Sequence, residues 1–333
     1  MVEFTNPGAA RLFLANSSCS GRVRLAVAER GFAVRYTDPA AMLAWCEAAA
    51  VNISSSTATP EAGMLLAHLG NAHRVSCNFL EADDYLRQAL AVAPNEPLIL
   101  EFYASLKKDM RQLDLAESFL KRAALLRRGA SDNDGLAKTL LNSALVLDES
   151  GFPDRAADSV LGALEIIGLL PESDERDRLA RAGFQNLASY LVNAGRAREA
   201  LWIVKLCKVR FMMGGEAAQL KIEWLLADIA GALGEIENAV VTYETVRRRF
   251  AALGQSQEVA VVTLDLARLL LEAQPLRARQ EALSIEPILD SLGIPADARE
   301  RKLLAEVVEK GSEAALVELA AALRANGLAR RSA

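Results

Sequence analysis

The chain has 333 residues, of which 52% are hydrophobic and only 5% are aromatic, and its net charge is -5. So few aromatic residues disfavour β-sandwiches and barrels, and the high apolar content with only 20 Gly and 10 Pro disfavours disorder. The 38 basic and 43 acidic residues are interspersed, so we expect no direct contact with nucleic acid or with a membrane.

The first predicted elements are two helices, over about residues 7–34 and 39–50. Asp38 followed by Pro39 is typical of a helix start, because Asp caps the backbone N–H groups and Pro fits the first turn. The two helices look like a degenerate pair that caps the chain over residues 1–60. The Ser- and Thr-rich stretch 52–60 is predicted to be a linker.

The sequence also predicts a cytoplasmic location. The apolar run at 12–15 is too short for a signal peptide and lacks a basic stretch before it. No apolar run approaches the roughly 18 residues that a membrane span needs. The four cysteines are scattered and form no CxxC pair, which favours a reducing compartment over a disulfide framework.

Five copies of one spacing follow within residues 63–254. In the first copy, Ala82 lies 12 residues after Gly70 and Ala89 lies 7 residues after Ala82. The same offsets link four further sets: Ala104, Ala116 and Ala123; Ala144, Ala156 and Ala163; Ala188, Ala200 and Cys207; and Ala227, Ala239 and Val246. Successive copies start 34, 40, 44 and 39 residues apart, so each copy is a rigid unit and the linkers take up the insertions. Small residues at fixed offsets predict two antiparallel helices in close contact.

These copies resemble the tetratricopeptide repeat (TPR) family. Residues 63–96 fit its pattern of small, large and Pro positions within 34 residues, and the sequence Asn193-Ala194-Gly195-Arg196 stands at an interhelix turn. The resemblance implies an all-α, right-handed superhelical solenoid of antiparallel helix pairs, continuous along the chain and with about 14–16 helices. The longer linkers suggest longer second helices, similar to those of TPR arrays in bacterial regulatory and signalling proteins.

Residues 255–333 are predicted to complete the same solenoid. A further helix pair is expected over 256–271 and 275–292, and two last helices over 297–309 and 313–325. Gly311 and Ser312 supply the turn between the last two. These helices would cap the array, whose end would otherwise expose an apolar face.

No group of residues indicates catalysis or a metal site. The two histidines are His68 and His73, and a site made by His73 and Cys77 would need further ligands such as Asp83. A surface His beside a small buried Cys explains this pair better. The run 132–135 lacks the remainder of a calcium loop and is typical of a helix start. We expect no enzymatic activity, no metal and no cofactor.

The expected functional surface is the concave groove, which the first helix of each TPR unit lines. The outward positions of these helices form a mixed polar set: Asn71, Arg74, Glu101, Ser105, Lys138, Asn142, Gln185, Ser189, Lys221, Trp224 and Asp228. Their amides can bond an extended peptide, and a partly exposed Trp224 is of the kind that anchors partners. Some TPR arrays clamp a C-terminal carboxylate, but only Asn71 and Lys138 match that clamp, so we do not expect one.

Two binding functions and one enzymatic function are compatible with this pattern. The leading interpretation is a scaffold or adaptor that binds a protein or peptide in the groove, in bacterial regulation or signalling. The second is a regulatory receptor for a peptide, similar to TPR pheromone receptors. A helical-repeat enzyme would need clustered acidic or His residues at one groove level, which the predicted groove positions do not supply.

Overall fold

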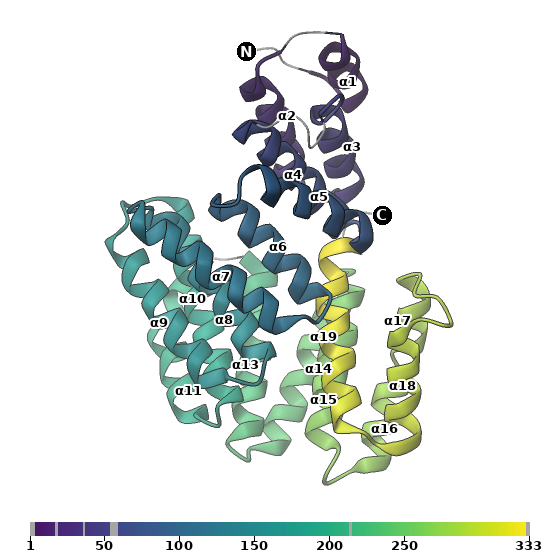
Figure 1. The fold of residues 1–333 in the computed structure, drawn as a ribbon. Coiled ribbons are helices and arrows are strands. Elements are labelled where there is room, and N and C mark those ends of the chain that lie inside the picture. The colour runs from purple at the N-terminus through teal and green to yellow at the C-terminus, as the bar shows by residue number, and fades with distance from the viewer. Residues whose placement is uncertain (1–3, 17–18, 36, 54–58, 213–214, 331–333) are drawn as a thin grey trace. The chain divides into compact units, whose positions relative to one another are not determined.

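The computed structural model describes residues 4–16, 19–35, 37–53, 59–212 and 215–330, and every regular element in these ranges is an α-helix (Figure 1). The chain divides into two compact units. The first unit comprises Met1–Gly151, Glu165–Leu170 and Leu328–Ala333, and the second comprises Phe152–Leu164 and Pro171–Gly327.

The first unit contains eight complete helices: α1 (Pro7–Ala15), α2 (Gly21–Ala33), α3 (Pro39–Ala49), α4 (Pro60–Val75), α5 (Phe79–Val92), α6 (Pro97–Asp109), α7 (Leu113–Gly129) and α8 (Asn133–Glu149). Asp38 caps α3 as predicted, accepting the backbone N–H of Ala41 at 2.8 Å. Thr59 caps α4 in the same way, so Pro60 opens that helix instead of ending the predicted linker. Residues 54–58 of that linker lie outside the described residues.

The single helix predicted over 7–34 is wrong, because two helices occupy this range. Helix α1 ends where Asn16 donates from its side-chain amide to the carbonyl of Leu12 at 2.9 Å. Asn, like the serines that follow it, competes for backbone hydrogen bonds and is a poor helix former, which explains an end at this point. Residues 17 and 18 lie outside the described residues.

The close helix contacts predicted from the repeat are confirmed. All three anchor positions of every copy are buried, from Gly70 in the first copy to Val246 in the fifth. A Cβ atom added to Gly70 would lie 2.8 Å from Cγ of Leu86 and 3.2 Å from the carbonyl oxygen of Ala82. Helices α4 and α5 therefore approach so closely that only glycine fits at this position without a shift.

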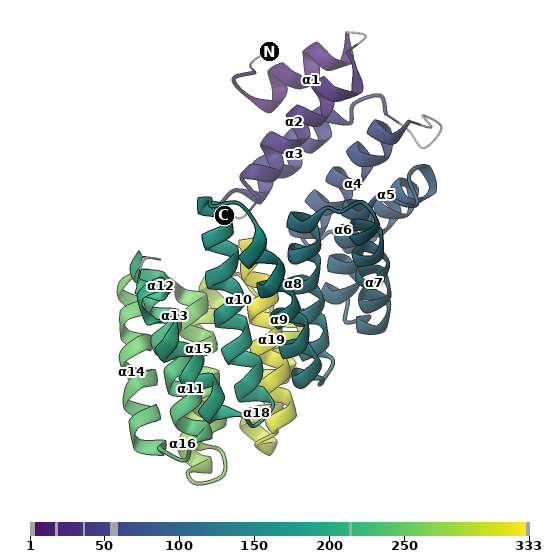
Figure 2. The same ribbon diagram turned by 90° about the vertical axis from the view of Figure 1, so that its left-hand side faces the viewer.

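The second unit contains the later helices (Figure 2): α10 (Asp174–Asn193), α11 (Ala197–Leu206), α12 (Lys208–Met212), α13 (Gly215–Ala232), α14 (Ile236–Ala252), α15 (Ser256–Leu270), α16 (Pro275–Leu283), α17 (Glu286–Ser291), α18 (Arg299–Lys310) and most of α19 (Glu313–Arg330). Helix α9 (Pro153–Leu169) begins in the second unit and ends in the first. The described residues thus form 19 helices instead of about 14–16.

Breaks within predicted helices account for the additional elements. The helix predicted over 275–292 is interrupted at Ser284 and Ile285, just before Pro287 near the start of α17. Pro lacks a backbone N–H group and disfavours helical geometry in the residue before it. Another break, at Cys207, separates α11 from α12.

The last helix packs on α15. Leu264 and Ala267 of α15 share one apolar core with Leu319 and Leu323 of α19, the yellow helix of Figure 1. The fold is the all-α helical-repeat solenoid that the sequence predicts, and the joining of the two units into one continuous array stays a prediction. Among the described residues, no helix has the length and apolar character that a bilayer span requires.

Candidate functional site

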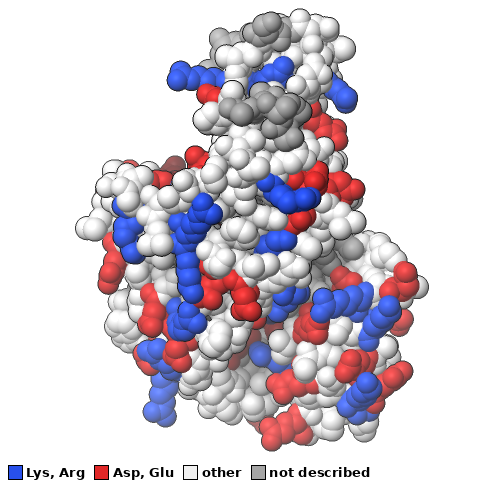
Figure 3. Space-filling model, viewed as in Figure 1, with Lys and Arg blue, Asp and Glu red and all other residues white. Residues whose placement is uncertain are grey.

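The predicted groove residues are distributed over both units. Asn71, Arg74, Glu101, Ser105, Lys138 and Asn142 belong to the first unit, and Gln185, Ser189, Lys221, Trp224 and Asp228 belong to the second. Charged residues of both signs are interspersed over the face drawn in Figure 3. The individual residues differ in how much of each side chain is left for a partner.

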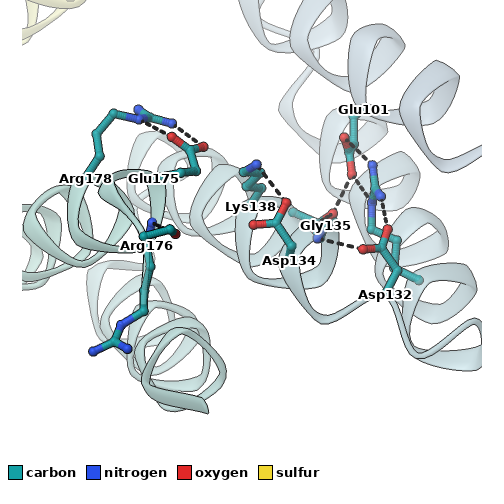
Figure 4. Close-up of polar contacts among 11 residues, drawn as sticks. Glu101, Asp132, Asp134, Gly135, Lys138, Glu175, Arg176 and Arg178 are labelled. Atoms are coloured by element: carbon teal, nitrogen blue, oxygen red, sulfur yellow. Dashed lines mark hydrogen bonds and ion pairs between the residues drawn. The ribbon is translucent and has the colours of Figure 1, made fainter. Parts of the chain in front are cut away.

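Glu101 is engaged inside the first unit and is only 7% exposed. Arg127 donates to both carboxylate oxygens of Glu101, at 2.7 and 3.1 Å, and the Thr139 hydroxyl donates to Oε1 at 2.5 Å. Arg127 also pairs with Asp132, which caps α8 by accepting the N–H of Gly135 at 3.0 Å (Figure 4). Asp132 therefore acts as the helix cap expected from the sequence, and Glu101 is neutralised by an internal network.

Asn71 is also internal, with 1% of its surface exposed. Its Oδ1 accepts from Nε of Arg74 at 2.9 Å, and the same guanidinium pairs with Asp109 at 2.6 Å. Burial acts to raise the pKa of Asp109, but the charges of Arg74 and Lys108 outweigh it and hold this pKa below the ordinary value. These contacts tie α4 to α6, so we leave Asn71 and Arg74 out of the proposed binding surface.

The remaining groove residues are more accessible. Lys138 is 38% exposed at its side chain and pairs with Asp134 one turn earlier, at 2.8 Å (Figure 4). Asn142 is exposed, and the partly buried ones are Gln185, Ser189 and Lys221. Their participation in binding stays a prediction.

Asp83, considered from sequence as a metal ligand, is used within the first unit instead. It accepts from Nζ of Lys107 at 2.6 Å and from the hydroxyl of Tyr103 at 3.0 Å. Its proposed companion His73 stacks on the ring of Tyr85, with 5.3 Å between ring centroids. These contacts engage both side chains within the first unit, whereas Cys77 is exposed and the prediction that it is buried is wrong.

Side chains from three helices of the second unit converge around Trp224 and Asp228 of α13. Tyr243 of α14 and Asp265 of α15 complete a group that we call the acidic–aromatic site. The indole Nε1 of Trp224 donates to Oδ2 of Asp265 at 3.1 Å, and the Tyr243 hydroxyl donates to Oδ1 of Asp228. Trp224 and Asp228 stay partly exposed, whereas Asp265 and Tyr243 are buried.

The electrostatics of the acidic–aromatic site are those of crowded acidic groups. Burial and the neighbouring charge of Asp265 raise the pKa of Asp228 to about 7. Burial and the charge of Asp228 likewise raise the pKa of Tyr243 well above its ordinary value. Negative charge at this site is therefore energetically unfavourable, and a nearby cation stabilises it.

Arg324 of α19 supplies such a cation. Its guanidinium NH2 donates to Oδ2 of Asp265 at 2.8 Å and its Cζ lies 5.7 Å from the centroid of the Trp224 ring. Half of the Arg324 side chain, 52%, remains exposed. This side chain contacts both the acidic and the aromatic parts of the acidic–aromatic site.

Sequence reasoning found Trp224 and Asp228 but missed Tyr243, Asp265 and Arg324. Asp265 left a signal, because it is the single charge within the mainly apolar run 259–267, where such a charge indicates a buried carboxylate that needs a partner. Arg324 left none, since its partner lies 59 residues away along the chain. Only the packing of α19 on α15 brings the two together.

No family model and no curated protein matches this sequence. Its fold is similar to a Rap protein complexed with competence and sporulation factor, at 14% identity over 93% of this chain and 88% of that one, with a TM-score of 0.61. The apo quorum sensor NprR from B. thuringiensis is 12% identical over 93% and 90% of the two chains, with a TM-score of 0.56. A tetratricopeptide repeat protein from Parabacteroides merdae is 17% identical over 90% and 99%, with a TM-score of 0.54. The chain thus has the TPR-like fold that its sequence predicts.

Proposed function

We propose that this chain is a non-catalytic module that binds a protein or peptide partner at the α13 face of its second unit. The observation that carries the proposal is the partly exposed pair Trp224 and Asp228, held in place by Asp265 and Tyr243. Lys221, Trp224 and Asp228 are spaced by three and four residues and so share one side of α13. A fixed, partly exposed Trp with polar neighbours is a frequent anchor of protein interfaces.

A solved complex of similar fold supports a peptide as one class of partner. NprR bound to its cognate peptide NprX is 15% identical over 90% of this chain and 85% of that one, with a TM-score of 0.55. Within our proposal, a scaffold or adaptor in bacterial regulation, acting in the cytoplasm, is the first role. The second role is a regulatory receptor for a short peptide, which the likeness to a quorum sensor favours.

A pair of tryptophan variants tests the proposed surface. Trp224 lies on α13, and Trp202 lies on the second helix of a pair, α11, where it is 62% exposed. The full chain, Trp224→Ala and Trp202→Ala are each immobilised and used to capture partners from a lysate of the source cells. We expect Trp224→Ala to lose about tenfold or more of the retained partner, as at an interface anchor, while Trp202→Ala retains it.

Circular dichroism of both variants establishes that the helix content is intact. Equal retention by Trp224→Ala and the unmodified chain would contradict the proposed surface, as would a loss confined to Trp202→Ala. Identification of the retained species then separates the two roles. A folded protein indicates a scaffold, and a short peptide indicates a receptor.

A further inference from the structure

A cation from the chain itself, Arg324, is bound at the acidic–aromatic site. The Arg324 guanidinium bonds to Asp265 at 2.8 Å and lies near the Trp224 ring, with Cζ 5.7 Å from its centroid. A carboxylate beside an aromatic face is the combination that proteins use to hold guanidinium and ammonium groups. Two acidic residues alone would not define a binding site, but the cation already bound there shows which chemistry fits.

The acidic–aromatic site contains two carboxylates, and Arg324 forms an ion pair with one of them. Asp265 pairs with Arg324, whereas Asp228 accepts its hydrogen bond from the neutral hydroxyl of Tyr243. Arg324 and Arg268 favour the charged form of Asp228, yet burial and Asp265 prevail and raise its pKa to about 7. A cation that approached Asp228 more closely would therefore be stabilised by a carboxylate that now binds a proton near neutral pH.

Arg324 can leave the site without disturbing the helix that carries it. Leu319 and Leu323 anchor α19 in the apolar core, and the side-chain amide of Gln257 donates to the Leu323 carbonyl. The Arg324 side chain is long, flexible and 52% exposed. Its partner Asp265 is buried, so Arg324 is exchanged only for another cation that pairs with the same carboxylate.

We propose that the acidic–aromatic site recognises an Arg or Lys side chain of the partner, and that Arg324 takes this place in the free chain. This inference rests on the proposed function and specifies the chemistry of the partner. The incoming cation displaces Arg324 from Asp265 and lies between Asp265 and Asp228 on the Trp224 ring. Protonated Asp228 releases its proton to solvent as the cation binds, so no other reactant is needed.

Two matched peptide pools test this recognition on the full chain. Both contain N-acetylated, C-amidated hexapeptides whose mixed positions hold neither Lys nor Arg, and one position is fixed as Arg in the first pool and as its neutral analogue citrulline in the second. The immobilised chain is compared with Arg324→Ala, Asp265→Asn and Arg299→Ala, the last removing an Arg of α18 that pairs with Glu318. Retained peptides are quantified by mass spectrometry.

We expect the chain to retain the Arg pool in preference to the citrulline pool. The preference should rise several-fold in Arg324→Ala, because the internal competitor is gone, and should disappear in Asp265→Asn. Arg299→Ala should behave as the unmodified chain does. If Asp265→Asn fails to fold, Asp228→Asn replaces it, since an amide oxygen can still accept from Tyr243, and the same loss of preference is expected.

The outcomes that overturn the inference differ from those that overturn the proposed function. Equal retention of both pools by the unmodified chain and by Arg324→Ala refutes cation recognition while peptide binding stands. An unchanged or weaker preference in Arg324→Ala refutes the role of Arg324 as competitor. Retention of neither pool, with the lysate partner still captured through Trp224, refutes the inference alone. Equal capture of the lysate partner by Trp224→Ala and by the unmodified chain refutes the proposed function.

Discussion

Asp228 of α13 lies near the negative charge of Asp265 of α15, and this charge strengthens the binding of a proton by Asp228. Its pKa rises from 3.8 to about 7 on folding, because of burial and the charge of Asp265. The folded chain therefore keeps a proton that the unfolded chain loses above pH 3.8, and stability falls as the pH rises from about 4 through about 7. An amide at this position does not titrate, so a chain with Asn at position 228 does not lose stability in this way as the pH rises.

We accordingly expect Asp228→Asn to be more stable than the unmodified chain at pH 8, by a margin that is clearly smaller at pH 4.5. Thermal unfolding followed by circular dichroism at both pH values measures this margin. Asp84→Asn is the matched control, because Asp84 is exposed and pairs with Arg87 on the same helix. A margin for Asp228→Asn that does not change with pH would show that Asp228 titrates normally.

Glu101 differs from Asp228, because its buried carboxylate is neutralised by Arg127 and also accepts a hydrogen bond from Thr139. Glu101→Ala removes one of the two carboxylates that pair with Arg127, and the Arg127 side chain is only 14% exposed. We expect a loss of about 3–5 kcal/mol in the free energy of unfolding. Glu175→Ala provides the comparison, since Glu175 pairs with Arg178 at the surface and should change stability by about 0.5 kcal/mol or less (Figure 4).

Chemical denaturation measures both free energies. A similar small effect in the two variants would mean that the Glu101 network contributes little to the stability of the first unit. A large effect in Glu175→Ala would contradict the distinction between buried and exposed pairs.

At the scale of elements, the close approach of α4 and α5 depends on Gly70. Leu at this position would place its Cβ 2.8 Å from Leu86 and 3.2 Å from the backbone of Ala82. We expect Gly70→Leu to lower the free energy of unfolding by about 1–3 kcal/mol through overpacking. Gly168→Leu is the matched control, because Gly168 is an exposed helical glycine with no atom within 4 Å of an added Cβ.

Gly168→Leu should be neutral or slightly stabilising, since any residue with a side chain other than Pro is a better helix former than Gly. The same denaturation experiment compares the two. Unchanged stability in Gly70→Leu would contradict the helix contact on which the repeat register depends.

Elements and their register were largely predictable from sequence, whereas helix breaks were not. Asp38 and the fixed offsets from Gly70 are local signals that cap a helix or set a contact, and the structure confirms both. The ends at Asn16 and Ser284 were missed, because weak helix formers decide the outcome at both. Helix propensity is a small term that the sequence pattern alone does not resolve.

The candidate site shows the same limit on a larger scale. Trp224 and Asp228 share a face of one helix, so their spacing of four residues was enough to identify them. Tyr243, Asp265 and Arg324 join them only through packing between α13, α14, α15 and α19. Periodicity likewise assigned Asn71 to the groove, although its side chain is almost fully buried.

At the scale of the whole chain, the two units use similar helix pairs for different purposes. In the first unit, internal bonds engage Asn71, Arg74 and Glu101. In the second, Trp224 and Asp228 remain partly exposed around an acidic centre that pairs with Arg324. We therefore assign partner binding to the α13 face of the second unit.

Site-specific photocrosslinking tests this assignment most directly. The photoreactive residue p-benzoylphenylalanine replaces Lys221, on the α13 face, or Val241 of α14, which is 62% exposed, and each chain is irradiated with its captured partner. We expect a covalent adduct with the partner from position 221 and none from position 241. An adduct from position 241 alone, or equal adducts from both, would contradict binding at the α13 face.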